Sequence, residues 1–320
     1  MTRPPQIIVF GSLNMDLMVR VARAPRGGET LRGLGFLANP GGKGANQAVA
    51  CARQGASVAM VGCVGRDGFG ETLRNALAAD GIDVTHVRSA GDTTGVAIVM
   101  VDDEGENRIT LVPGANDLLK ADAEVLGRAV AGQFLLLQCE VPMDEVVQAA
   151  EIMRGKGAIV VLNPAPVCKL PDKLWSLVDI IVMNEIEASE LAGQPVKDAA
   201  SAAAAAASIR GRGPSTAVVT LGSQGVVIAD ERGCRHFAAL AVRTVDTTAA
   251  GDTFIGAMCA ARAAGQSTDA AVMRGIQAAT LCVMRAGAQA SIPRYDELEQ
   301  VQPVAAPSAL AGPSQQAREK

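Results

Sequence analysis

The sequence predicts an α/β fold, with a doubly wound, mainly parallel sheet, helices on both faces and a small β-sheet lid. Short apolar runs alternate with helical patterns along most of the chain, which predicts strand–loop–helix units with right-handed crossovers. The composition is 49% hydrophobic but includes only 6 Phe, 1 Tyr and 1 Trp, so small aliphatic side chains must fill the core. Residues 17–38 and 94–112 carry strand and turn patterns instead of helices, and these two segments predict the lid.

The alternation of elements can be followed along the chain. Predicted core strands cover residues 6–10, 58–61, 84–87, 134–138, 158–162, 180–183, 217–221, 226–229 and 235–238. Predicted helices cover residues 45–54, 69–79, 123–131, 143–155, 199–209, 253–264 and 268–285. We expect residues 1–300 to form a single domain. From residue 303 Pro, Ala, Ser, Gln and Gly dominate, so residues 303–320 are predicted to be a disordered tail.

Charge and cysteine usage limit the classes of partner and site. The net charge is −4 and no basic block occurs, which argues against nucleic acid or an anionic membrane as the main partner. The 7 Cys form no C-x-x-C pair and only 2 His are present, so we expect reduced thiols and no zinc site. Neither a signal-peptide pattern nor an apolar span of membrane length is found, and we therefore expect a cytoplasmic protein.

Residues 245–254, read V-D-T-T-A-A-G-D-T-F, are the most informative stretch. Small residues precede a predicted helix, so a backbone there can approach a ligand closely. The start of a helix offers unpaired N–H groups to an anion. A carboxylate at Asp252 would lie beside that anion, an arrangement that suits phosphoryl transfer to a hydroxyl group. The alternative is that Asp252 only caps the helix.

Two further patterns indicate a polar ligand. Lys43 and Asn46 are three residues apart where the glycine-rich loop 41–44 enters a helix, so they share one helix face. The loop is not a Walker A motif, because Gly44 follows Lys43. Asn14 and Asp16 are two apart and point to one side of an extended segment. Together these side chains suit a polyhydroxylated ligand, although a solvated Lys, a capping Asn and a local turn remain the alternatives.

Polar residues recur where the predicted strands end. In a parallel sheet these ends gather at one edge, where open α/β sheets bind ligands. The residues are Asn14, Asp16, Glu140, Asn163, Asn184, Glu187, Thr220 and Ser223. Each alone is more often a cap or a turn residue, and their shared position is the stronger signal.

Three motifs together resemble the ribokinase branch of the PfkB sugar kinases. They are G-S-L-N-M-D at residues 11–16, G-G-K-G-A-N-Q-A at 41–48 and D-T-T-A-A-G-D-T-F at 246–254. Shorter matches are N-P-A-P at 163–166, N-E-x-E at 184–187, T-L-G-S at 220–223 and R-x-G-A-Q at 285–289. The resemblance covers roughly residues 6–298 and implies that residues 1–300 form one ribokinase-like kinase domain. It further implies ATP-dependent phosphorylation of D-ribose at the 5-hydroxyl.

The resemblance also assigns roles to individual residues. Asp252 would be the base, and Ala249, Ala250 and Gly251 would form the anion hole. Sugar hydroxyls would be bound by Asn14, Asp16, Gly42, Lys43, Asn46, Glu140 and Asp252. Asn184 and Glu187 would serve the phosphate and Mg²⁺ end of ATP. The nucleotide would also be bound by Thr220, Gly222, Ser223, Gly225 and Gly251. An activating K⁺ would be held by Asp246, Thr248 and Ser291 and by backbone groups of Cys282, Arg285 and Gly287.

Several points stay open at this stage. Ile276, followed by Gln277, stands where many relatives carry Asn or His against adenine. Related enzymes pair through their lids, so the resemblance implies a homodimer, and the unpaired strand edges of the predicted lid need a partner as well. Alternatives to ribose are deoxyribose or another pentose, or a nucleoside, for which the lid offers only Phe36 as an aromatic wall. A non-catalytic sugar-binding regulator is a further alternative.

Overall fold

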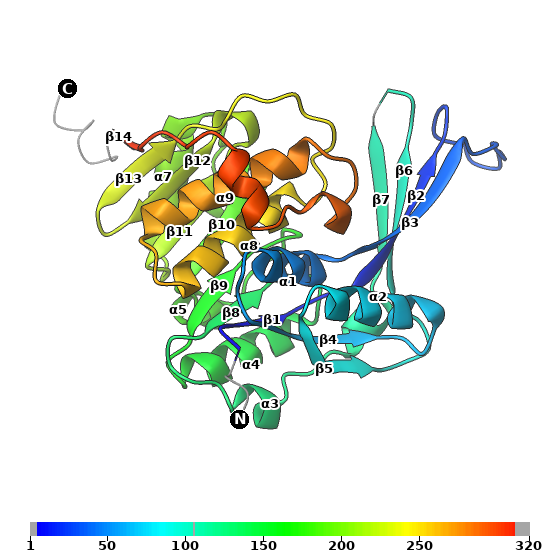
Figure 1. Ribbon diagram of the computed structural model, residues 1–320, viewed down its shortest axis with the longest axis horizontal. Coiled ribbons are helices and arrows are strands. Elements are labelled where there is room, and N and C mark those ends of the chain that lie inside the picture. Colours follow the sequence, from blue (N-terminus) through cyan, green and yellow to red (C-terminus); the bar gives the residue numbers. More distant parts are fainter. Residues whose placement is uncertain (1–4, 105, 311–320) are drawn as a thin grey trace.

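The computed structural model describes residues 5–104 and 106–310, and the side chain of Asn107 is not described. A twisted main sheet lies between two layers of helices, and a second, smaller sheet extends from one end of it (Figure 1). The main sheet has the spatial order β14 (Ser308–Leu310), β13 (Gly233–Phe237), β12 (Val226–Asp230), β11 (Thr216–Thr220), β10 (Ile180–Asn184), β9 (Ile159–Leu162), β8 (Phe134–Leu137), β1 (Ile7–Phe10), β4 (Val58–Val64) and β5 (Asp83–Ser89).

The strands from β11 to β5 are all parallel to their neighbours, while β12, β13 and β14 add an antiparallel edge. Strand β1 lies between β8 and β4, with Phe10 paired to Leu137 on one side and Val61 on the other. The chain therefore reverses its winding direction around β1. In such sheets the strand ends near the reversal form a crevice where ligands bind.

Alternate residues of the strands face two separate apolar layers. Leu135 and Leu137 of β8 pack into one buried cluster, whereas Phe134 and Leu136 pack into the other. Helices α1 (Lys43–Arg53), α2 (Gly68–Ala79), α8 (Ala250–Ala263) and α9 (Thr268–Val283) cover the second cluster. The first is covered by α3 (Ala123–Leu126), α4 (Met143–Arg154), α5 (Asp172–Leu177), α6 (Glu185–Ala192) and α7 (Ala199–Arg210).

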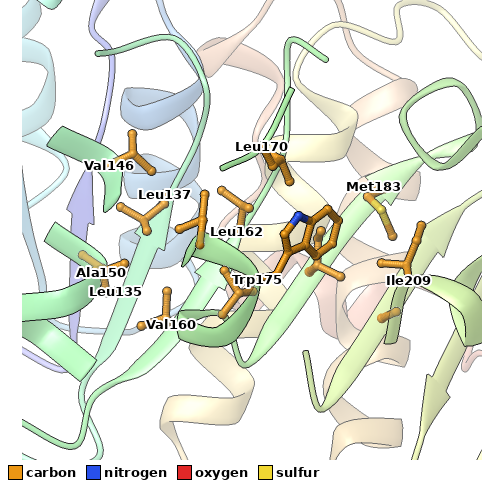
Figure 2. Packing of buried hydrophobic residues seen from close by; sticks show 14 of the residues in the cluster. Leu135, Leu137, Val146, Ala150, Val160, Leu162, Leu170, Trp175, Met183 and Ile209 are labelled. Atoms are coloured by element: carbon orange, nitrogen blue, oxygen red, sulfur yellow. The ribbon is translucent and has the colours of Figure 1, made fainter. Parts of the chain in front are cut away.

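Figure 2 shows the packing of the first cluster around Trp175, the one Trp of the chain. Leu162 from β9 and Leu170 from the following loop lie close to the indole, and Val146 and Ala150 of α4 lie over β8 (Figure 2). These side chains are at most 5% exposed. Burial of this kind contributes about 1.5–3 kcal/mol per large apolar side chain, so the strand ends that carry the site rest on a rigid base.

The lid is a four-stranded sheet in the order β3 (Gly35–Gly41), β2 (Asn14–Arg20), β6 (Gly95–Val101) and β7 (Asn107–Val112). It confirms the small β-sheet expected from residues 17–38 and 94–112. Strand β2 begins three residues earlier than that expectation, so Asn14 and Asp16 belong to the lid itself and pair with Gly41 and Asn39 of β3. The lid strands extend away from the layered core (Figure 1).

Other differences concern the ends of elements. Ser308–Leu310 form β14 and pair with β13, so the disordered-tail prediction is wrong for these residues, whereas 311–320 lie outside the described residues. Helix α3 ends at Leu126 rather than residue 131. Helices α5 and α6 were not expected, because each is short and α6 follows β10 without a loop. Helix α1 begins at Lys43, two residues before its predicted start.

Candidate active site

Helix α8 begins with an unusual turn at Ala249. This N-cap residue has φ 60° and ψ 8°, the one positive φ of a non-glycine residue in residues 5–104 and 106–310. Such a conformation costs an Ala about 1–2 kcal/mol, so tertiary contacts must hold it. At Gly251 an added Cβ would meet no heavy atom within 4 Å. The first turn of α8 therefore borders open space. The Ala250 N–H donates to Thr247 O at 3.2 Å, and the N–H groups that follow it lie at the positive end of the helix dipole, which suits an anion.

Asp252 follows in the same turn and is held from the neighbouring helix α1. Asn46 Nδ2 donates to Asp252 Oδ2 at 3.1 Å, and Gln47 Nε2 donates to Asp252 Oδ1 at 3.0 Å. The two helices come this close because Gly256 of α8 lies against α1, where a Cβ would be 2.4 Å from Ala50 Cβ. The capping alternative is not what is seen, since the N-cap of α8 has no side-chain hydrogen bond.

Burial and charge act in opposite directions on Asp252. Burial raises the pKa of this carboxyl above its usual value, and Lys43 and the two amide donors lower it in part. Lys43 lies at the start of α1; burial lowers its pKa, but nearby carboxylates outweigh burial and raise it. A carboxylate with a raised pKa in a water-poor site is a competent proton acceptor near neutral pH.

A second polar cluster lies where β1 and β8 end. Glu140 Oε2 accepts hydrogen bonds from Ser12 Oγ at 2.6 Å, from the Lys43 backbone N–H at 3.2 Å and from Asn14 Nδ2 at 3.4 Å. Asn116 Nδ2 donates to Asn14 Oδ1 at 2.8 Å and so fixes the Asn14 amide. This cluster presents carboxylate and amide groups that match the donor and acceptor pattern of sugar hydroxyls.

Asp16 completes this side of the site from lid strand β2. Its carboxylate lies over Gly41, where a Cβ would be 2.1 Å from Asp16 Oδ2. Burial, followed by repulsion from Glu140 and Asp252, raises the pKa of Asp16 to about 7. Gly42 has φ 89°, and a Cβ there would lie 2.7 Å from the Asn14 backbone N. Only glycine permits this approach of α1 to the lid strand.

Two adjoining cavities open at this edge of the sheet. The smaller, about 210 Å³, is lined by Lys43, Asn163, Asn184, Glu187 and Asp252 among others. The larger, about 490 Å³, extends from Gly251 toward α9. Both are lined by Thr220, Thr247, Ala250 and Gly251. An elongated ligand filling both would have its middle at the N-terminus of α8.

The larger cavity has the walls expected for a nucleotide. Thr220, Gly222, Ser223 and Gly225, which the family resemblance assigns to the nucleotide, line one side of this cavity. Apolar residues line the remainder, namely Val226, Leu240, Val242, Phe254, Ile276, Ala279 and Val283. Ile276 therefore supplies an apolar surface, which suits the face of a purine ring. The following Gln277 instead donates to Gln302 O at 3.4 Å.

Asn184 and Glu187 form a capping box at the start of α6. Glu187 N–H donates to Asn184 Oδ1 at 2.8 Å, and Asn184 N–H donates to Glu187 Oε2 at 2.9 Å. Both residues line the smaller cavity with Lys43 and Asp252. Burial raises the pKa of Glu187, while the Asn184 backbone and Lys43 lower it in part. Asn184 and Glu187 therefore cap helix α6 and, at the same time, line a cavity large enough for a phosphate group.

The loop before α8 is tied to the end of α9. Asp246 accepts hydrogen bonds from Thr248 Oγ1 at 2.6 Å and from the Gly287 N–H at 2.9 Å. Cys282 Sγ donates to Thr248 O at 3.6 Å, and Ser291 Oγ lies 3.1 Å from that sulfur. These predicted ion-loop residues are therefore neighbours. The Arg285 side chain is directed elsewhere and pairs with Glu297.

The predicted site residues outside the α8 turn and the ion loop gather at one edge of the sheet in two groups. The sugar-side group is Asn14, Asp16, Gly42, Lys43, Asn46 and Glu140; the nucleotide-side group is Asn184, Glu187, Thr220, Gly222, Ser223 and Gly225. The sequence patterns assigned no role to Ser12, Gln47, Asn116 or Gln138 and marked Asn163 only as a polar residue at a strand end. All five hold these groups in place. Gln47 directly follows Asn46 in the glycine-rich motif, so the sequence could have indicated that Gln47 belongs to the site.

The fold and this site define a class of doubly wound α/β proteins in which a buried carboxylate and a helix N-terminus share one cavity. Comparison with known proteins identifies the family. The pfkB family of carbohydrate kinases matches residues 4–294, and the chain belongs to this family.

Individual relatives are similar over nearly the full length. The chain is 42% identical to ribokinase of Haemophilus influenzae over 297 residues, covering 91% of this chain and 96% of the relative. It is 39% identical to ribokinase of Schizosaccharomyces pombe over 306 residues, covering 92% and 96% of the two chains. The structure of Arabidopsis thaliana ribokinase complexed with ribose and ATP has a TM-score of 0.86 at 32% identity, covering 93% of this chain and 98% of that one. Across the described residues, no helix is long and apolar enough to span a membrane.

Proposed function

We propose that this protein transfers the γ-phosphoryl group of ATP to the 5-hydroxyl of D-ribose. One observation carries the proposal. The buried Asp252 carboxylate lies next to the N-terminus of α8, between a sugar-sized polar cluster and a nucleotide-sized groove. The two relatives named above are ribokinases at 42% and 39% identity, and one neighbouring structure, at 32% identity, is a ribokinase complexed with ribose and ATP.

On the sugar side, the Asp16 and Glu140 carboxylates would accept hydrogen bonds from ribose hydroxyls, and the Asn14 amide could both accept and donate. Asn46 Oδ1 is buried and has no hydrogen-bond partner within the described chain, which supports a missing ligand hydroxyl at this point. Lys43 brings positive charge to a cluster of carboxylates. Asp252 then takes the proton of the 5-hydroxyl as that oxygen attacks phosphorus.

On the nucleotide side, the Ala249–Gly251 turn would hold the phosphoryl oxygens as charge shifts toward the leaving ADP. Backbone N–H groups at a helix start cost no reorganisation during the reaction. Mg²⁺ suits one or two carboxylates together with substrate phosphates. Glu187 lines the same cavity as Gly251 and fits this need, with Asn184 fixing its carboxylate. The ion would neutralise phosphate charge.

The Asp246 loop would hold K⁺. Its oxygen donors are Asp246, Thr248, Ser291 and backbone carbonyls near Cys282, Arg285 and Gly287. Hard oxygen donors of this kind fit a monovalent cation. The ion would keep the turn at Ala249 in one geometry from behind and would take no part in the bond changes.

The substrate test measures ATP consumption by the purified protein with ribose, deoxyribose, hexoses and nucleosides at equal concentration. We expect the highest kcat/KM with ribose, because Phe36 is the one aromatic side chain that the described lid strands offer to a base. If the highest kcat/KM is found with a nucleoside or with deoxyribose, that compound and not ribose is the substrate. Ribose binding without any ATP consumption would favour the sugar-binding regulator instead.

The lid is the surface through which two copies would pair. Leu37 is 57% exposed and Ile109 61%, and the pairing of β3, β2, β6 and β7 places both on one face of the lid. Phe36, 64% exposed, lies on the other face, so both faces carry exposed apolar side chains. We expect light scattering to give the mass of a homodimer at micromolar concentration. The variant Phe36→Asp should dissociate toward a monomer under the same conditions. A monomeric mass for the unchanged protein would contradict this arrangement.

A further inference from the structure

Gln47 is fully buried behind the base and is used completely by hydrogen bonds. Its Nε2 donates to Asp252 Oδ1 at 3.0 Å and to Asn163 Oδ1 at 3.3 Å, and its Oε1 accepts from Gln138 Nε2 at 2.7 Å. Gln47 and Gln138 are 0% exposed, so neither touches a ligand in the cavities. Gln47 therefore acts on the site through the two cavity-lining residues that it contacts, Asp252 and Asn163.

The orientation of the Gln47 amide is fixed from two independent ends. The Val182 carbonyl can only accept, and Asn163 Nδ2 donates to it at 3.0 Å, so Asn163 Oδ1 must face Gln47. The ionised Asp252 carboxylate also accepts only. Both neighbours therefore require Gln47 to present its NH₂ group, and Gln138 then faces the remaining oxygen. A flipped amide would set acceptor against acceptor at two places.

We propose that Gln47, oriented by Gln138 and Asn163, is a positioning residue that keeps Asp252 ionised and aimed before the sugar binds. This inference rests on the proposed function of Asp252 as the base. Asn46 and Gln47 each supply a donor, one to each carboxylate oxygen. A protonated Asp252 would bring an O–H group against one of these donors and lose a hydrogen bond. The pair therefore opposes the effect of burial.

Several charged or titratable groups also act on Asp252 from the surrounding elements. Lys43 on α1 favours the ionised form. The groups that disfavour ionisation come from the end of β8, from β2, α6 and α9, and are Glu140, Asp16, Glu187 and Cys282. None of these groups is altered by a change at Gln47, so a matched variant isolates the contribution of the amide.

The sign of the expected change follows from these contacts. Hydrogen bonds to a carboxylate favour its charged form, so their removal raises its pKa. In Gln47→Met the acidic limb of the plot of kcat/KM against pH should move to higher pH by about one unit. At pH values on the acidic side of that limb, kcat should fall about tenfold or more relative to the unaltered protein. This is the effect expected for a lost hydrogen bond to a charged group. Ribose KM should change little, because Gln47 is sealed from the cavity.

The control is Gln54→Met, at the end of the same helix. Gln54 is also buried, at 7% exposure, but its Nε2 donates to Pro293 O, away from the base. Gln138→Met removes the partner that orients Gln47 and should give a smaller shift in the same direction. It decides the matter if Gln47→Met does not fold.

The direct measurement is the carboxyl titration of Asp252 by ¹³C NMR in the full-length protein, read beside the pH–rate profile. A higher pKa in Gln47→Met or Gln138→Met, with no shift in Gln54→Met, supports the proposal. An unchanged Asp252 pKa in both Gln47→Met and Gln138→Met, or an equal pKa shift in Gln54→Met, overturns the proposal. If the unaltered protein phosphorylates no ribose, the proposed function fails, but the NMR titration still tests the positioning role.

Discussion

Asp252 and Asp16 are carboxylates of one site that the molecule treats differently. Asp252 stands on core helix α8 with both oxygens bonded to amides of α1. Asp16 stands on lid strand β2, and no hydrogen bond to its carboxylate is found in the described part of the chain. The core thus holds one group in its working geometry, while the lid presents another that lacks a partner. The group proposed for the chemical step, Asp252, is therefore held in place before the ligand binds. The group proposed for sugar binding, Asp16, would gain its hydrogen-bond partner only from the ligand.

Apart from a change of Asp252 itself, the largest effect should come from filling the space beside this core carboxylate. At Gly251 an added Cβ would meet no protein atom within 4 Å, so we expect Gly251→Val to fold and its side chain to extend into the phosphate region. Loss of an anion-hole contact lowers kcat by about 10²–10³-fold. Steady-state kinetics with ribose and ATP measures this effect.

The matched control is Gly68→Val, because Gly68 also lies in the first turn of a helix with no atom near its Cβ position. Its thermal stability should change as in Gly251→Val, while its kcat stays at the level of the unaltered protein. Full activity in Gly251→Val would show that the turn of α8 does not receive the phosphoryl group.

An intermediate effect should follow from a change on the lid side. In Asp16→Ala a ribose hydroxyl loses its acceptor, at a cost of roughly 1–3 kcal/mol. Calorimetry should show weaker ribose binding by about 5–150-fold, since 1.4 kcal/mol corresponds to a factor of ten. ATP binding should stay unchanged. An equal loss for both ligands would point to misfolding and would remove the division between lid and core.

The smallest effect concerns the loop behind the core carboxylate. At constant ionic strength, K⁺ should raise kcat severalfold and Na⁺ should do so poorly, because a carbonyl cage suits the larger ion. Asp246→Ala should abolish this dependence and leave the circular dichroism spectrum intact. A flat response of the unaltered protein to K⁺ would exclude the ion from the mechanism.

The same contrast explains what could be predicted from the sequence. Asp252, Lys43, Asn46 and Gly251 lie in motifs whose residues are neighbours in the chain, and their shared helix turns made their grouping predictable. The lid sheet was expected because its segments alternate apolar and polar residues. Its position relative to Asp252 was not, since the pairing of β2 with β6 joins segments about eighty residues apart.

The residues that hold the site were harder to find. Gln138 and Asn116 act through partners that are distant in sequence, such as Gln47 and Asn14, and a lone buried amide carries no periodic signal. Strand β14 was missed because its composition is that of a linker. Its three residues are ordered by pairing to β13, which no local pattern reveals.

The most direct test of the account is Asp252→Asn, which keeps the shape of the side chain and removes its ability to accept a proton. The measurement is kcat for ribose-dependent ATP consumption, with ribose affinity by calorimetry on the same preparation. We expect kcat to fall by about 10²–10⁴-fold, the range for loss of a general base, while ribose affinity changes little. A variant that keeps near-full kcat would contradict the assignment of Asp252 as the base.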